Sequence, residues 1–121
     1  MEDAHLRGSN EFQKVYRTGK RYEGQLFTAF VLRNSLGSHR LGVTASKKAL
    51  GRAVDRNRAK RLLRDTFRNT SEPLGRLQGR YDWVLNARKR LLLPESRRRV
   101  QEFEKIVASV ATQEGDSVVR S

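Results

Sequence analysis

The residues of this 121-residue chain best suited to chemistry are the cations of segment 47–68, KKALGRAVDRNRAKRLLRDTFR. Nine of these 22 residues are lysine or arginine, and only Asp55 and Asp65 oppose them. A guanidinium group donates hydrogen bonds from a planar fork that matches the oxygens of a phosphate. The segment therefore indicates binding of a polyanion such as nucleic acid.

Helical periodicity divides this segment into two faces. On an ideal helix, at about 100° per residue, one arc holds the mainly apolar residues Ala59, Leu62, Leu63, Thr66 and Phe67. The opposite arc holds Asn57, Arg58, Lys60, Arg61, Arg64 and Arg68, with Arg56 at the border. A solvated helix face would mix the two signs of charge in i,i+4 pairs. Like charges recur here at 56, 60, 64 and 68, which favours a face that a polyanion neutralises.

The composition of the whole chain agrees with this interpretation. Lys and Arg number 26 against 13 Asp and Glu, a net charge of +13, and 36% of the residues are apolar. This length and composition predict a single RNA-binding domain over residues 1–121, with one modest core. The sequence has no cysteine, which excludes disulfides and Cys-based zinc sites.

Membrane association is the weaker alternative for so basic a chain. No apolar run approaches the ~18 residues of a membrane span, and no signal peptide opens the sequence. A basic amphipathic helix can lie on an anionic membrane, but that interpretation requires tryptophan or large aliphatic residues over a broad apolar face. We therefore expect a cytoplasmic protein without a membrane partner.

Residues for catalysis or metal binding are sparse. His5 and His39 have no second ligand at metal spacing and are expected at the surface. Asp82 is expected to cap a turn, and the glycines match no phosphate-binding loop. Glu102 and Glu104 are expected on the surface of a helix, so no carboxylate cluster for Mg²⁺ is predicted. We predict no catalytic residue and no metal site in the protein.

The elements that must position the basic segment follow from turn residues and periodicity. Helices are predicted over 9–18 with Ser9 as the cap, over 53–68, and over 94–113 with Pro94 near the start. Strands are predicted over 20–33 (straight or bent), 40–46 and 82–88, with a loop over 69–80. Residues 1–8 and 114–121 are expected to be disordered tails.

The order α-β-β-α-β-α predicts an α+β fold, a single-domain sandwich of a small sheet of about four strands with helices packed on it. The strands that flank the basic helix are candidates for a parallel pair joined by a crossover, a connection that is nearly always right-handed. Phe12 and Tyr16 lie one helical turn apart, so they can stack on unpaired bases or pack in the core.

At segment 46–68 the sequence resembles a known family. SKKALGRAVDRNRAKRLLRDTFR is similar to the signature of the bacterial ribonuclease P protein subunit, with its SKK step, G-x-A-V element, R-N-R triplet and K-R-x-x-R. EFQKVYRTG at 11–19 resembles the family's first helix, LGVTASKK its central strand and YDWVLNARK its late strand. The resemblance covers about residues 6–112.

The resemblance implies a division of labour. An RNA subunit cuts the 5′ leader from precursor tRNA with Mg²⁺. The protein is a monomer that forms a 1:1 complex with this RNA. It binds the RNA subunit and the precursor tRNA, and it has no catalytic residues of its own. The R-N-R helix contacts the catalytic RNA, which implies Arg52, Arg56, Asn57, Arg58, Lys60, Arg61, Arg64 and Arg68. A cleft between the first helix and the sheet receives the leader, which implies Phe12, Tyr16, Phe30, Ser46, Lys47, Lys48, Arg88 and Lys89.

The resemblance also implies an unusual left-handed crossover around the basic helix, against the general rule, and here we follow the resemblance. Two residues depart from the family pattern: Asn86 stands where an apolar or small residue is usual, and Tyr16 where Phe is common. Two other functions use the same charge pattern. A structural ribosomal or chaperone-like RNA binder needs no leader cleft, and a protein-only nuclease would cleave without added RNA.

Overall fold

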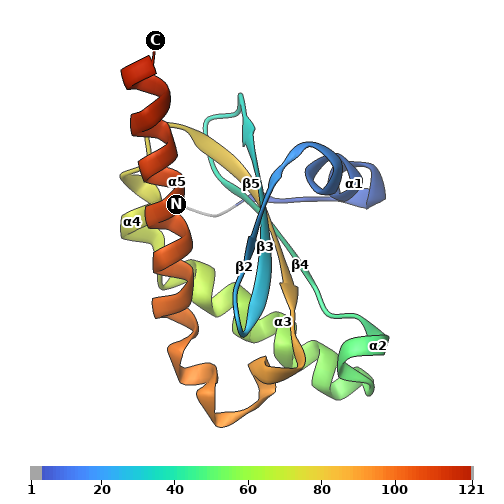
Figure 1. Cartoon of the computed structure of the whole chain (residues 1–121). Helices are drawn as coiled ribbons and strands as arrows, with labels where there is room; N and C mark the ends of the chain where they lie inside the picture. Colours follow the sequence, from blue (N-terminus) through green and yellow to red (C-terminus); the bar gives the residue numbers. More distant parts are fainter. Residues whose placement is uncertain (1–3, 121) are drawn as a thin grey trace.

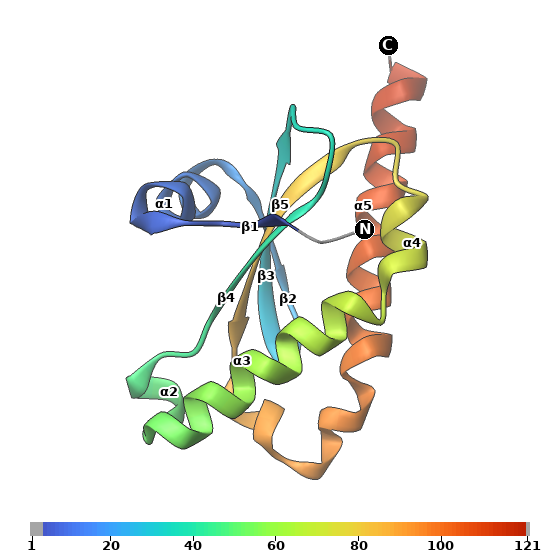
Figure 2. The same ribbon diagram turned by 180° about the vertical axis from the view of Figure 1, so that it is seen from behind.

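The computed structural model describes residues 4–120, and the side chains of residues 5–115. Its centre is a five-stranded mixed sheet in the order β1-β4-β5-β3-β2 (Figures 1 and 2). The strands are β1 (Ala4–His5), β2 (Lys20–Glu23), β3 (Phe27–Asn34), β4 (Arg40–Thr44) and β5 (Arg80–Ala87). The helices are α1 (Gly8–Thr18), α2 (Lys47–Leu50), α3 (Ala53–Arg68), α4 (Ser71–Gly75) and α5 (Arg99–Arg120), with 3₁₀ turns η1 (Lys89–Leu92) and η2 (Pro94–Arg98).

The predicted α+β architecture is confirmed, including the parallel pair around the basic helix. Strands β4 and β5 are parallel neighbours, with Gly42 opposite Val84 and Thr44 opposite Asn86. The chain between them contains α3, whose bounds Ala53–Arg68 coincide with the predicted helix. The left-handed sense of this crossover stays a prediction.

The two faces of the sheet are covered unequally. Helices α3, α4 and α5 lie on one face, whereas α1 lies on the other (Figures 1 and 2). The α3/α5 face carries the main core, in which Trp83 contacts Phe103 at a ring-centroid distance of 5.3 Å and Phe67 at 6.4 Å. The α1 face has only a small core of Leu6, Val15 and Val84. Strand alternation places Trp83 and Leu85 in one core and Val84 in the other.

The predicted strand over 20–33 is instead a hairpin of β2 and β3. Its turn is held from a distance, because the Glu102 carboxylate on α5 accepts hydrogen bonds from the backbone N–H groups of Gln25, Leu26 and Phe27. Glu102 is thus half-buried and structural, not a surface residue. The predicted loop 69–80 contains the short helix α4.

Two helix starts differ from prediction. Helix α1 begins at Gly8, and Arg7, not Ser9, is its N-cap residue. The Glu11 carboxylate accepts the backbone N–H of Arg7, so a charged side chain in the first turn satisfies one of the free N–H groups at the start of the helix. Pro94 opens a 3₁₀ turn, and the last α-helix begins only at Arg99.

The expected tails differ as well. Leu6 is buried in the small core and its N–H donates to the Leu41 carbonyl. Helix α5 continues past residue 113 to Arg120. Its buried Glu114 carboxylate accepts from the N–H groups of Gln78 and Gly79 and from the Tyr81 hydroxyl. Buried partners, invisible in the sequence, order both segments; residues 1–3 and 121 lie outside the described residues.

His39 is half-buried rather than a plain surface residue. Its Nδ1 accepts hydrogen bonds from the backbone N–H of Tyr81 and from Trp83 Nε1, both at 3.1 Å, and its Nε2 lies 2.9 Å from the Leu74 carbonyl oxygen. The ring also stacks on Tyr81 at 6.1 Å. His39 therefore ties the start of β5 to α4.

Candidate nucleic-acid interface

Helix α3 has the two faces that periodicity predicts. Ala59, Leu63, Thr66 and Phe67 are buried against the sheet and α5, and Leu62 is half-buried. The exposed polar side chains are Asn57, Arg58, Arg61, Arg64 and Arg68, while Arg56 and Lys60 are half-buried, and Ala53 and Val54 in the first turn are exposed as well. An amphipathic helix thus docks through one stripe and leaves its cations outward.

The exposed arginines of α3 differ in their acidic partners. Arg52 lies 3.2 Å from Asp55, and Arg68 lies 3.6 Å from Asp65, which also faces Arg99 at 3.6 Å. Within the described part of the chain, Arg58, Arg61 and Arg64 form no ion pair. Three neighbouring guanidinium groups are therefore left for an external anion. We define these three residues as the arginine face.

The short helix α2 presents the lysines of the SKK step. The Ser46 hydroxyl accepts the N–H of Ala49 at 3.1 Å and caps α2, while Lys47 and Lys48 are exposed. Gly51 has φ of +75° at the turn between α2 and α3, a conformation that a side chain would strain. The chain can therefore turn at once from the lysines of α2 to the cationic helix (Figure 2).

Aromatic side chains meet on the α1 face of the sheet. The ring centroids of Tyr16 and Phe30 are 4.9 Å apart and their planes are at 89°. Arg21, which the sequence did not single out, lies over the Phe30 ring at 5.7 Å. Tyr16 remains 37% exposed, so its ring is the one most available for stacking.

Phe12 is mainly a packing residue. It is half-buried against the small core, and a Cβ added at Gly42 would lie 2.5 Å from its ring. The absence of a side chain at Gly42 thus allows α1 to approach β4 closely. Of the two interpretations that the sequence left open, the structure favours core packing for Phe12.

Asn86, the departure from the family pattern, lies at the centre of the α1 face. Its Oδ1 accepts hydrogen bonds from the Tyr16 hydroxyl at 3.0 Å and from the Thr44 hydroxyl at 2.5 Å. Asn86 and Thr44 are half-buried, as is Phe30. We define the open face as the surface formed by Tyr16, Phe30, Thr44 and Asn86.

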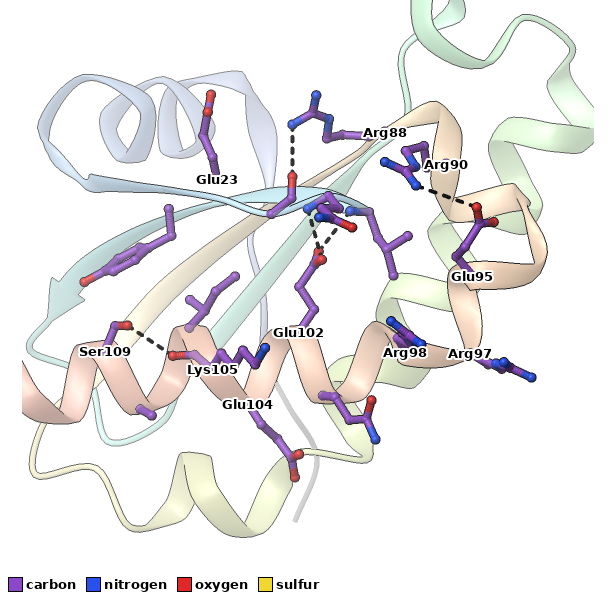
Figure 3. A pocket seen from close by; sticks show the side chains of 17 residues that line it. Glu23, Arg88, Arg90, Glu95, Arg97, Arg98, Glu102, Glu104, Lys105 and Ser109 are labelled. Atoms are coloured by element: carbon purple, nitrogen blue, oxygen red, sulfur yellow. Dashed lines mark hydrogen bonds and ion pairs between the residues drawn. The ribbon is translucent and has the colours of Figure 1, made fainter.

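The remaining predicted cations lie at the ends of neighbouring strands. Because Thr44 pairs with Asn86 in parallel strands, the chain leaves both strands at the same end of the sheet, toward Lys47 and Arg88. Arg88 Nη1 donates to the Gly24 carbonyl at 2.9 Å (Figure 3), and Lys89 is exposed. Lys47 and Lys48 lie on α2, and Arg88 lies between β5 and η1.

A shared ion-pair hub, which the sequence did not predict, anchors α1 to the sheet. Arg40 Nε and Nη2 donate to the two Asp82 oxygens at 2.8 and 2.7 Å, and Nη1 donates to Glu11 at 2.6 Å. Asn34 adds a hydrogen bond to Asp82 at 2.8 Å. Asp82 is therefore a buried partner of Arg40, not a turn cap. The hub fixes the helix that carries Tyr16.

The hub shifts the pKa of both acids downward. Burial alone would raise the pKa of Asp82, but hydrogen bonds from Arg40 and Asn34 outweigh it and the net pKa is lowered. The pKa of Glu11 is lowered by the Arg7 backbone N–H and by Arg40. Charged forms of both carboxylates are thus favoured in the folded protein.

A hollow lies between the β2–β3 turn, η2 and α5, away from the arginine face and the open face (Figure 3). Its cations Arg88, Arg90, Arg97, Arg98 and Lys105 are interspersed with the acids Glu23, Glu95, Glu102 and Glu104. Arg90 pairs with Glu95 at 3.6 Å. Mixed signs of this kind are typical of a solvated surface, so the hollow is a weaker candidate for RNA than the arginine face.

Within the described residues, no three His, Cys, Asp or Glu side chains cluster as metal ligands. None of the described helices combines the length and apolar character needed to cross a bilayer. These features define a class: a small, basic α+β protein that presents a cationic helix beside a partly uncovered sheet face.

Comparison with known proteins identifies the family within that class. The family model described as Ribonuclease P matches residues 1–111, and the chain belongs to the bacterial ribonuclease P protein family. It is therefore a subunit of the tRNA-processing endoribonuclease, and the ribonuclease P RNA is its implied partner.

Individual relatives are similar over most of their length. The ribonuclease P protein component of Clostridium botulinum (strain Langeland) is 39% identical over 89 residues, covering 73% of this chain and 77% of that protein. That of Natranaerobius thermophilus is 41% identical over 70% of each chain. The structure of the Staphylococcus aureus RNase P protein has a TM-score of 0.73 and 25% identity, covering 91% of this chain and 96% of that one.

Proposed function

We propose that this subunit binds the catalytic RNA through the arginine face and the 5′ leader of precursor tRNA across the open face. The observation that carries the proposal is the set of exposed guanidinium groups of Arg58, Arg61 and Arg64, which form no ion pair with any of the described residues. Such groups bind phosphates bidentately and release counterions from RNA. Arg52, Arg56, Asn57, Lys60 and Arg68 flank this face and extend the contact.

The open face suits a single-stranded leader. Such strands are held by stacking on aromatic rings and by cations that follow the backbone. Tyr16 offers a ring beside Phe30, while Phe12 packs against Gly42 of β4 and holds α1 on the sheet. The chain leaves β4 and β5 at the same end of the sheet, and the residues that follow would line the path of the leader phosphates. These residues are Ser46, Lys47, Lys48, Arg88 and Lys89.

In this proposal the RNA subunit supplies the chemistry and holds the Mg²⁺ ions, and the protein carries no catalytic residue. One protein binds one RNA, in the cytoplasm. The protein contributes affinity and orientation, since neutralised phosphates and stacked bases hold substrate and catalyst together.

A cleavage assay tests the proposal. A bacterial ribonuclease P RNA is incubated with precursor tRNA at low Mg²⁺, with and without this protein. We expect the protein to restore cleavage, because it replaces cations that otherwise screen the two RNAs. Absence of rescue would favour a structural RNA binder, and cleavage by the protein alone would reveal a protein-only nuclease.

A further inference from the structure

The amide of Asn86 has an orientation fixed by its neighbours. Both the Tyr16 and the Thr44 hydroxyl donate to its Oδ1. Tyr16 comes from α1 and Thr44 from β4, so the acceptor oxygen is held from two separate elements. The NH₂ group therefore points away from both hydroxyls.

That NH₂ group is left without a partner. Among the described residues, Asn86 Nδ2 donates no hydrogen bond, and it is not one of the buried unsatisfied atoms, which are Arg56 Nε and Arg99 Nε. The two N–H donors thus reach solvent on the open face. A partly buried donor without a partner is readily satisfied by an arriving ligand.

We propose that Asn86 makes the open face selective for one base of the leader, favouring a base whose Watson–Crick edge presents a carbonyl oxygen to the amide over one that presents an amino group there. This inference rests on the proposed leader binding. A free asparagine amide presents one donor and one acceptor and so matches adenine. Here the acceptor is already used by Tyr16 and Thr44, and only donors remain.

The position of Tyr16 brings a base edge to this amide. Because the Tyr16 hydroxyl contacts Asn86 at 3.0 Å, a base stacked on the Tyr16 ring has its edge close to the amide. Unpaired bases are read in this way, by stacking together with hydrogen bonds to the Watson–Crick edge. A carbonyl oxygen of the base accepts a hydrogen bond from Asn86 Nδ2. An amino group of the base is itself a donor, so it forms no hydrogen bond with Nδ2.

The test compares leader bases that exchange a carbonyl oxygen for an amino group at this position. The holoenzyme, reconstituted with a bacterial ribonuclease P RNA, binds precursor tRNAs whose leader is varied at one nucleotide at a time. Uridine and cytidine differ by a carbonyl or an amino group at the same position, as do inosine and adenosine. At one leader position we expect uridine over cytidine and inosine over adenosine by about 2- to 10-fold, the value of one hydrogen bond.

Asn86→Asp is the informative variant. An aspartate still accepts from both hydroxyls, so the local structure is kept, but its second oxygen is now an acceptor. The preference should reverse toward cytidine and adenosine, even though added charge weakens binding of every leader. Loss of packing cannot reverse a preference. Asn86→Leu should abolish it, and thermal unfolding verifies that each variant is folded.

A double substitution tests whether the Tyr16 and Thr44 hydroxyl groups fix the orientation of the Asn86 amide. Tyr16→Phe with Thr44→Val keeps the ring and the size of both side chains but releases Oδ1, so the amide can present either edge. The uridine preference should then fall toward unity.

The outcomes separate this inference from the proposed function. If leader-bearing and leaderless tRNA bind equally, leader binding itself is wrong. If the leader contributes but every base is equivalent, or if the preference persists in Asn86→Leu, base selectivity by Asn86 is overturned and Nδ2 contacts a phosphate or nothing.

Discussion

At the scale of single residues, exposure separates side chains that are available to a ligand from those that pack in the core. Tyr16 and Phe12 lie one turn apart on α1, yet Tyr16 is 37% exposed while Phe12 rests on Gly42. The sequence identified both rings but could not assign them different roles, since that depends on how closely α1 approaches β4.

Replacing Tyr16 by alanine should weaken precursor-tRNA binding roughly 5- to 150-fold, because a stacked ring is worth about 1–3 kcal/mol. Binding of mature tRNA, which lacks a leader, should barely change. Tyr16→Phe is the matched control, since it keeps the ring and should retain most of the affinity. An equal loss for both tRNAs in a folded variant would refute the assignment.

The arginine face predicts how strongly the affinity for the RNA subunit depends on salt concentration. Each phosphate contact contributes about one unit to the slope of log affinity against log salt concentration. The double variant R58A/R61A should therefore bind the RNA subunit with a slope lower by about two. Arg76→Ala is the control, because Arg76 is exposed directly after α4 but pairs with Glu72 at 3.3 Å. An unchanged slope in the double variant places the RNA contact elsewhere.

At the scale of elements, helix α3 was predictable and its neighbours were less so. Its amphipathic period is local, and its bounds coincide with the prediction. The β2–β3 turn depends on Glu102, which lies 75 to 77 residues away along the chain. Contacts of that range leave no local pattern, which is why a hairpin was read as one strand.

The buried side of α3 should govern stability rather than RNA contacts. Phe67→Ala should cost about 3–5 kcal/mol and Leu63→Ala about 2–5 kcal/mol of unfolding free energy, since both side chains are almost fully buried. Leu62→Ala should cost less because Leu62 is only half-buried. Denaturant unfolding measures the three values. A large loss of RNA affinity without loss of stability would reverse our assignment of the two faces.

The hub that anchors α1 predicts a dependence of stability on pH. Asp82 and Glu11 have a lowered pKa in the folded state, so their contribution is present at pH values above the ordinary values of 3.8 and 4.5. It is lost as the pH falls through the lower folded values. Unfolding measured from pH 7 to pH 3 should show a smaller acid-induced loss in Asp82→Asn than in the unaltered protein. Equal losses would exclude Asp82 as a source of the effect.

At the scale of the whole molecule, charge and element order were sufficient to predict an RNA-binding α+β protein. The placement of the open face was not, because it depends on α1 being tied by Arg40 to one end of the sheet. His39 and Glu114 were expected at the surface or in a tail for the same reason: each is satisfied by backbone groups distant in sequence. Local patterns report what a segment can form, and long-range partners decide where it lies.

The two proposed RNA surfaces can be distinguished in one cross-linking experiment. The sequence has no cysteine, so a single introduced cysteine carries a photoreactive group to one position. Arg61→Cys probes the arginine face, Arg21→Cys probes the margin of the open face beside Phe30, and Arg76→Cys, directly after α4, serves as the control. In the assembled holoenzyme with precursor tRNA, we expect position 61 to cross-link to the catalytic RNA, position 21 to the leader, and position 76 to neither. Leader cross-links from position 61, or equal yields from all three positions, would contradict the division of labour between the two faces.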